Sequence, residues 1–252
     1  MFNWKDRFRA SGIHLCISLA LAFLAGLLVF GLWFPYPYRE ISGGRELFLL
    51  LVTVDVILGP LITFSIVSRG KLRKVLMRDL VVVGALQLAA LGYGLWAVFL
   101  ARPVHLVFEF SRFRVVHAVE VSPEMLAKAP PGLATMPLFG PTLLSVRPFK
   151  NGNEQLDATL ADLAGMPVGA RPDLWQSYEA GKPQVLKAAK PVSELKARMP
   201  AQASAIDKAA AAAGRRADAL AYLPMVGRKT FWTVLIDPGT AQVLAFMPLD
   251  SF

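Results

Sequence analysis

Three apolar runs in the first 100 residues constrain the fold of this chain more than any other feature. They cover residues 12–34, 47–67 and 80–100, and each is long enough to cross a bilayer, which takes about 20 apolar residues in a helix. We therefore expect a transmembrane domain of three bundled helices over residues 1–102. The remaining residues, 103–252, are enough for a second folded domain.

The first apolar run could be mistaken for a secretory signal, because Lys5, Arg7 and Arg9 precede it. It is too long for a signal peptide, and no small-x-small cleavage site ends it, so we expect an uncleaved anchor. The only cysteine, Cys16, lies in this run without the sequence context for lipidation. The second domain therefore has no internal disulfide and must be stabilised by packing.

Basic residues in the short loops predict the orientation of the spans. Residues 35–46 carry two Arg balanced by two Glu, whereas the N-terminal tail and the second loop are basic. We therefore expect the tail and the second loop in the cytoplasm of a bacterium, the spans in its inner membrane, and residues 103–252 in the periplasm. The basic residues of the second loop are Arg69, Lys71, Arg73, Lys74 and Arg78.

The net charge of +9 does not indicate a nucleic-acid partner. Residues 1–100 carry 10 Lys and Arg against 5 Asp and Glu, while residues 101–252 carry 17 against 13. More than half of the positive excess thus belongs to the membrane half, where it sets the orientation. No stacking aromatic residues accompany the basic loop, which suits anionic lipid headgroups better than nucleic acid.

A carboxylate interrupts the second apolar run. Asp55 lies near its middle, and Gly59-Pro60 follows one turn later. A charge at the centre of a membrane helix costs roughly 2.5–3.5 kcal/mol on insertion scales, so a functional role is the default interpretation. Pro60 cannot donate a backbone hydrogen bond and bends the helix. Two roles stay open: Asp55 locks the bundle, or it engages a polar group on a visiting helix.

Depth in the membrane suggests partners for Asp55. If the second and third spans are antiparallel, Tyr93 lies at nearly the same depth, and we expect its hydroxyl to donate to the carboxylate. Gln87 and Thr63 form a second expected polar pair, nearer the cytoplasm.

Small residues recur at helical spacing in the first and third runs. Such ridges either pack the spans against one another or face the transmembrane helix of a partner. They are Ser18, Ala22 and Gly26 in the first run, and Ala85 with Ala89, or Ala90 with Gly94, in the third.

The second domain opens with residues 104–121, which alternate like a strand. They predict a hairpin with its turn at Ser111-Arg112, which places Glu109 opposite Arg114. One long bent strand is the alternative.

The rest of this domain predicts short helices, loops and a closing hairpin. Residues 230–236 and 241–247 flank the turn sequence Asp237-Pro238-Gly239-Thr240. Strands at both ends with short helices between them indicate a small α+β domain with antiparallel strands. One expected helix begins at Pro123, and the others cover residues 156–163, 193–199 and 201–213. The last of these is nearly all alanine, and we expect it on the surface. The expected loops cover residues 129–153, which include an apolar run at 143–146, and residues 165–192, which Trp175 and Tyr178 anchor.

No residue set in the second domain has the pattern of an active site. Its histidines, His105 and His117, fall on opposite faces of the predicted hairpin, so we expect no shared metal. The domain has no Gly-x-Ser-x-Gly elbow, phosphate-binding glycine loop or cysteine pair. We expect neither enzymatic activity nor a cofactor.

Short motifs along the chain carry a family resemblance. They are Asp55-x3-Gly59-Pro60-Leu61-Ile62-Thr63, Gly70-Lys71, Asp79-Leu80, Gln87-Leu88, Tyr93-Gly94, Arg102-Pro103 and Phe108-Glu109-x2-Arg112-Phe113, with the region from Leu223-Pro224 to Trp232. In these motifs the chain resembles the type IV pilin accessory family (TfpX/TfpZ type), most strongly over residues 47–121. Ser111 departs from the pattern, which has an acidic residue before Arg-Phe.

The resemblance implies a non-enzymatic chaperone that stabilises a cognate major type IV pilin in the inner membrane before pilus assembly. The pilin, the lipid bilayer and other pilus assembly components are the expected partners. It also implies which residues bind the pilin. These are Asp55, Gly59, Pro60, Gln87 and Tyr93 in the membrane, and Phe108, Arg112 and Phe113 in the periplasmic domain.

Two other classes of protein remain as alternatives. A membrane-anchored sensor would bind a ligand in its periplasmic domain and report through the spans. It would need a cytoplasmic output, whereas the predicted cytoplasmic parts are only about 11 and 12 residues long. A membrane-embedded enzyme built on Asp55 would need a second catalytic group in the spans, which we do not expect.

Overall fold

The computed structural model describes residues 4–67 and 72–252, and the chain folds into two compact units. Two residues of the predicted cytoplasmic loop, Arg69 and Lys71, lie outside the described residues. The units are Met1–Arg39 with Gly43–Ala101, called here the membrane unit, and Glu40–Ser42 with Arg102–Phe252, called here the head.

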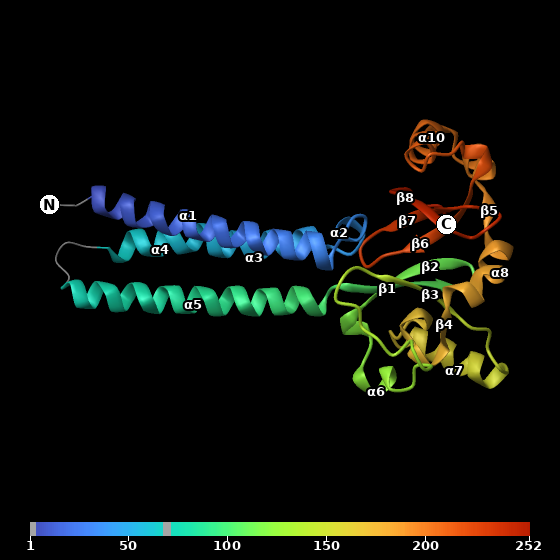
Figure 1. Ribbon diagram of the computed structural model, residues 1–252, viewed down its shortest axis with the longest axis horizontal. Helices are drawn as coiled ribbons and strands as arrows, with labels where there is room; N and C mark the ends of the chain where they lie inside the picture. The colour runs from blue at the N-terminus through green and yellow to red at the C-terminus, as the bar shows by residue number, and fades with distance from the viewer. Residues whose placement is uncertain (1–3, 68–71) are drawn as a thin grey trace. The chain divides into compact units, whose positions relative to one another are not determined.

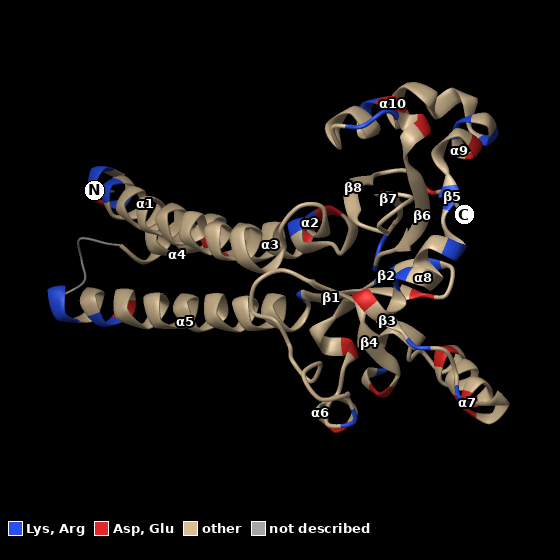
Figure 2. Ribbon diagram, turned by 45° about the vertical axis from the view of Figure 1, so that its right-hand side comes forward, with Lys and Arg blue, Asp and Glu red and all other residues tan. Residues whose placement is uncertain are grey.

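Three long apolar helices make up the membrane unit (Figure 1). Each is long and apolar enough to cross a membrane, which confirms the predicted three-helix bundle. Lys and Arg gather at the N-terminal ends of α1 and α5, while the middles of these helices carry little charge (Figure 2). The elements are α1 (Trp4–Leu28) and η1 (Val29–Trp33), then α2 (Tyr38–Ile41), then α3 (Gly44–Thr53), η2 (Val54–Leu58) and α4 (Gly59–Ile66) in the second span, and α5 (Arg73–Leu100) in the third.

The second span has the irregularity that its sequence predicts. Segment η2 is π-helical and ends directly before Gly59 and Pro60. Because Pro60 has no N–H, the carbonyl four residues earlier loses its usual partner, and a wider helical turn is one way to accommodate the loss. Asp55 lies within this π-helical segment.

The glycines of the predicted ridges allow close approach between spans. A side chain on Gly26 would come within 3.2 Å of the Phe48 ring, and one on Gly94 would collide with Leu51. These two glycines thus pack the spans against one another. By contrast, Ala85 and Ala89 are exposed along α5.

The head is a mixed sheet with short helices, and most of its strand pairs are antiparallel, which confirms the predicted α+β class. The strand order is β4-β3-β1-β2-β6-β7-β8, with β5 paired to β6; only β1–β3 and β2–β6 are parallel. The strands are β1 (Pro103–Glu109), β2 (Arg112–His117), β3 (Thr142–Val146), β4 (Trp175–Ser177), β5 (Lys190–Pro191), β6 (Ala221–Val226), β7 (Phe231–Ile236) and β8 (Val243–Met247). The helices are α6 (Pro123–Leu126), α7 (Gly152–Leu163), α8 (Tyr178–Ala188), α9 (Val192–Arg198) and α10 (Ala203–Ala212), with single 3₁₀ turns η3 (Ala118–Glu120), η4 (Val168–Ala170), η5 (Pro172–Leu174), η6 (Pro200–Gln202) and η7 (Ala217–Ala219).

Apolar packing on the sheet stabilises the head, and two clusters illustrate it. One gathers around Trp175 from β1, β2, β3 and the segments near η4 and η5. The other packs α9 and α10 against β6, β7 and β8, and Ile206 is the large residue that the alanine-rich α10 contributes. The remaining surface of α10 is mostly exposed, as its composition predicts.

The predicted hairpin of residues 104–121 exists, but its register was wrong by two residues. Phe108 pairs with Phe113, and Glu109 with Arg112, so the turn is Phe110-Ser111. Phe110 adopts the left-handed conformation, with φ of 55°. The shift by an even number keeps the same side chains on each face, which is why the pattern alone did not reveal it.

Most other predicted elements of the head are confirmed. They include the helix that begins at Pro123 and the hairpin around Asp237. The apolar run at residues 143–146, expected within a loop, forms strand β3. The loop predicted for residues 165–192 was wrong, because it contains β4 and α8. Helix α8 carries Gly181 and Pro183, two residues that usually argue against a helix. Trp175 and Tyr178 are buried anchors, as expected.

Candidate functional site

Asp55 lies in the irregular part of the second span and is 8% exposed. Its side chain lines a cavity of about 420 Å³ between the three spans, together with His14, Thr63 and Gln87. The rest of the lining is mostly apolar, so the cavity combines a few polar groups with a surface that suits an apolar segment. The other lining residues are Ala10, Ile13, Ile17, Ser18, Leu21, Leu80, Gly84 and Leu88.

The first span contributes polar contacts that the sequence analysis missed. His14 Nδ1 lies 2.6 Å from Thr63 Oγ1, and the Ser11 hydroxyl donates to the Pro60 carbonyl at 2.8 Å. With buried Ser18, these residues form a polar face at helical spacing on α1. The signal was present, because a histidine in an apolar span is itself unusual.

Gly59 brings two polar side chains close to the second span. A Cβ at this position would collide with the Gln87 amide and lie 3.0 Å from His14 Nε2. The absence of a side chain at Gly59 therefore permits His14 and Gln87 to approach the segment that carries Asp55. Of the predicted intramembrane residues, Asp55, Gly59, Pro60 and Gln87 lie together.

Tyr93 does not fill the predicted role of hydrogen-bond donor to Asp55. Both residues line a second, smaller cavity of about 270 Å³, which agrees with the expectation that they lie at similar depth. Tyr93 is 70% exposed, however, and its ring packs on Trp96 with centroids 5.7 Å apart. Within the described part of the chain, the Tyr93 hydroxyl makes no hydrogen bond to Asp55. Among the described residues, the side-chain partner of the Thr63 hydroxyl is His14 and not the predicted Gln87, although both Thr63 and Gln87 line the cavity.

The polar side chains of this site form a hydrogen-bonding set. Over residues 4–67 and 72–252, no three His, Cys, Asp or Glu side chains are grouped closely enough to hold a metal ion. The carboxylate, imidazole and amide around the cavity can donate or accept hydrogen bonds. They could therefore recognise a polar group carried by an otherwise apolar helix.

Two of the three predicted head residues lie in the core. Phe108 and Phe113 are buried and pack edge to face, with ring centroids 5.7 Å apart. Their side chains are thus not available at the surface of the head, and the structure gives them a packing role. Arg112 is partly exposed, and its Nε donates to Glu109 Oε2 at 3.1 Å.

The buried carboxylate of Glu109 joins the hairpin to the rest of the head. Its Oε1 accepts from Arg114 Nε at 2.9 Å and from the Gly169 N–H at 2.6 Å. A side chain on Gly169 would lie 2.6 Å from the same oxygen, so glycine is needed for this approach. The cluster is a structural device at the end of β1, and it explains the Glu-x2-Arg motif of the hairpin.

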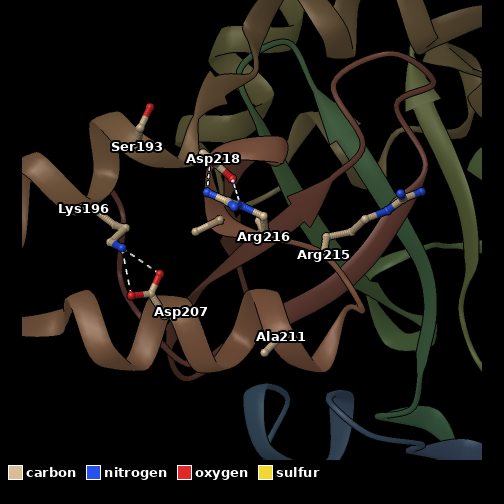
Figure 3. Close-up of a pocket in the computed structure, with 8 residues that line it drawn as sticks. Ser193, Lys196, Asp207, Ala211, Arg215, Arg216 and Asp218 are labelled. Carbon is tan, nitrogen blue, oxygen red and sulfur yellow. Dashed lines mark hydrogen bonds and ion pairs between the residues drawn. The ribbon is translucent and has the colours of Figure 1, made fainter.

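A charged cleft of about 530 Å³ lies between α9, α10 and η7 (Figure 3). Lys196 Nζ donates to both carboxylate oxygens of Asp207, at 2.7 and 2.8 Å, and Arg216 pairs with Asp218 at 2.9 Å. Arg215 also lines the cleft. Because the other four charges form two ion pairs at an open surface, they offer less to a ligand than the membrane cavity does.

Comparisons with known proteins decide the family. A family model described as "Fimbrial assembly protein FimB" matches residues 2–43. A "Fimbrial assembly protein, serogroup I" of Dichelobacter nodosus is 33% identical over 254 aligned residues, which cover 98% of each chain. The chain belongs to the fimbrial assembly protein family.

Other members of this family are similar over different lengths. The serogroup E1 protein of the same organism is 32% identical, again over 98% of each chain. The protein of serogroups C1 and C2 is 37% identical over 129 residues, which are 50% of this chain and 98% of that relative. No solved structure matches this chain. The protein is thus a membrane protein with a role in pilus assembly.

Proposed function

We propose that this protein is a non-enzymatic chaperone that binds a cognate major pilin in the bacterial inner membrane and stabilises it until it is assembled. Family membership supports the role in assembly. The proposal that the protein binds and stabilises a pilin rests on Asp55, which is buried in the distorted second span and lines a mostly apolar cavity. A pilin waiting in the membrane presents an apolar helix, and the cavity offers that helix apolar walls and a polar centre.

The proposed orientation places the N-terminus in the cytoplasm and the head in the periplasm. The basic residues Arg73, Lys74 and Arg78 lie at the start of α5, and Lys5, Arg7 and Arg9 at the start of α1, which supports this proposal because basic residues are enriched at cytoplasmic ends. In this orientation one protein can contact both the membrane helix and the globular part of a pilin.

The head offers surfaces for the globular part of the pilin. Strand β8 pairs only with β7 and is one edge of the sheet, where a strand of a partner can add. Helix α7 exposes Leu156, Leu160 and Leu163 at helical spacing, which gives an apolar stripe. Either surface would contact a folded domain by shape and apolar area.

Replacing Asp55 tests the proposal. Asp55→Asn removes the carboxylate but keeps the size of the side chain, and we expect a several-fold lower level of the cognate pilin and fewer surface pili. The matched control is Ser65→Ala, because the Ser65 hydroxyl donates only within its own helix, to the Leu61 carbonyl at 2.9 Å. Immunoblots of pilin and of this protein, with electron microscopy of pili, give the readout.

The outcome separates a binding role from a structural one. Normal pilin and pili with Asp55→Asn would refute the proposed role of the carboxylate, provided that the variant protein accumulates normally. A photocrosslinker at Gln87 or Leu88 should also capture the pilin, because both residues line the cavity. Loss of that crosslink in Asp55→Asn would place the effect at the cavity itself.

A further inference from the structure

Two segments of the head meet at Arg102, the second residue after the third span ends. The Arg102 carbonyl accepts the Ala118 N–H at 3.0 Å, and its Nε donates to the Pro137 carbonyl at 3.3 Å. Two residues of backbone span at most about 7 Å, so both segments are held within roughly 15 Å of the end of α5. Chain connectivity alone sets this limit.

Both segments expose large apolar side chains beside this anchor. Val119 follows Ala118 and is 59% exposed, while Leu138 and Phe139 follow Pro137 and are 54% and 68% exposed. The same loop buries other apolar residues, because Leu133 and Met136 pack against the head core. The loop thus has an inner apolar part that fixes it and an outer apolar part that is mostly exposed.

The conformation of the loop keeps its tip turned outward. Pro137 and Pro141 flank the tip and restrict their own backbone angles, and Gly140 adopts φ of 61°, which favours glycine. A tip held in this way loses little conformational entropy when it binds a surface.

We propose that Val119, Leu138 and Phe139 form an interfacial patch that inserts into the lipid bilayer at the end of the third span. The bilayer is the surface that chain connectivity guarantees to be near, since α5 crosses it. The polar interfacial layer is roughly 5–8 Å thick on each side, and apolar side chains on a polypeptide at this level bind by burying their area.

The charges around the patch agree with a lipid surface. Residues 129–141 contain no Asp or Glu. The nearest acid in the other segment, Glu120, keeps its charge, and its Oε2 accepts the His117 backbone N–H at 2.7 Å. Anionic headgroups would therefore meet no acid from the loop that carries Leu138 and Phe139, and one hydrogen-bonded carboxylate beside Val119. This proposal is independent of any pilin.

Site-directed spin labelling tests the patch in the full-length protein. In a Cys16→Ser background, a nitroxide is attached at Phe139→Cys, and the protein is reconstituted in vesicles of phosphatidylcholine and phosphatidylglycerol. We expect the label to be several-fold more accessible to oxygen, relative to a water-soluble nickel complex, than a label at Ser204→Cys. Ser204 is a matched control, since it is exposed on α10, outside the two segments and outside the surfaces proposed for the pilin.

A second label and a second condition make the test decisive. A nitroxide at Val119→Cys should show the same preference for oxygen as the one at position 139. Water-like accessibility at both positions would overturn the proposal. The proposal would also be overturned if the two labels became protected from the nickel complex only after pilin is added, because the patch would then be a protein contact. The substituted side chains are exposed, so none of the variants removes a core residue.

Discussion

The imidazole of His105 packs edge to face on the indole of Trp175, with ring centroids 4.6 Å apart and planes at 65°. His105 is buried, and its Nδ1 lies 2.7 Å from Thr142 Oγ1. Burial lowers the pKa of His105 from 6.5 to about 4, because the charged imidazolium is poorly solvated there. The folded head therefore holds this histidine neutral through the physiological range.

This lowered pKa predicts that the head loses stability in mild acid. Between pH 6.5 and about 4 the unfolded chain binds a proton at His105 that the folded chain does not. The free energy of unfolding should thus fall by up to about 3 kcal/mol as pH drops through this window. Above pH 6.5, His105 should contribute no further pH dependence. His105→Phe keeps a ring against Trp175 and removes the titration. Thermal unfolding followed by tryptophan fluorescence should show a flatter pH profile for the variant, and identical profiles would contradict the assignment.

Removing the buried carboxylate of Glu109 should destabilise the head strongly. Glu109→Ala leaves Arg114 and the Gly169 N–H without their acceptor, and we expect a loss of about 3–5 kcal/mol in the free energy of unfolding. The control is Glu179→Ala, which breaks an exposed pair with Lys182 and should cost about 1 kcal/mol or less. Denaturant unfolding of the purified protein measures both, and equal losses would show that the Glu109 cluster contributes little.

A side chain at Gly44 should disturb the membrane unit. A Cβ there would collide with the Phe34 ring, which is fully buried and has little room to move. We expect Gly44→Ala to lower thermal stability in detergent by the equivalent of about 1–3 kcal/mol. Gly92→Ala is the matched control in α5, because nothing lies within 4 Å of the added Cβ. A neutral result at Gly44 would mean that Phe34 repacks freely.

Truncating Ile41 should loosen the turn between β6 and β7. Ile41 is fully buried against Gly227, and its carbonyl accepts the Lys229 N–H at 3.2 Å. We expect Ile41→Ala to cost about 2–5 kcal/mol, whereas Leu156→Ala on the exposed face of α7 should change stability by about 0.5 kcal/mol or less. Hydrogen exchange at Lys229 gives a local readout, and unchanged protection there would refute the contact.

The spans could be predicted because their length and composition leave few alternatives in a bilayer. The partner of Asp55 could not be predicted from depth. Depth does not fix the direction in which a side chain points, because successive residues of a helix are rotated by about 100°. Gly94 packs on Leu51, whereas the adjacent Tyr93 is mostly exposed. The depth argument compared only the second and third spans. It therefore did not reveal His14, which the first span contributes beside Thr63.

In the head, local signals identified turns and caps but not the centre of the sheet. Strand β6 was not predicted, and its Pro224 is a residue that argues against a central strand. On the side away from β7, β6 pairs with β5 at residues 221–222 and with β2 at residues 225–226. Pro224 lies between these two short pairings, so its missing N–H costs no ladder bond there. Only the long-range arrangement of three strands makes this proline acceptable.

The burial of Ile41 also changes how the head is joined to the rest of the chain. Glu40–Ser42 belong to the head, while the residues on either side belong to the membrane unit, so the backbone passes between the two units three times. A domain on a single linker is joined covalently to one span alone. Here the packing of Ile41 holds its segment in the head, so the head is joined through the backbone to the first and second spans as well as to the third.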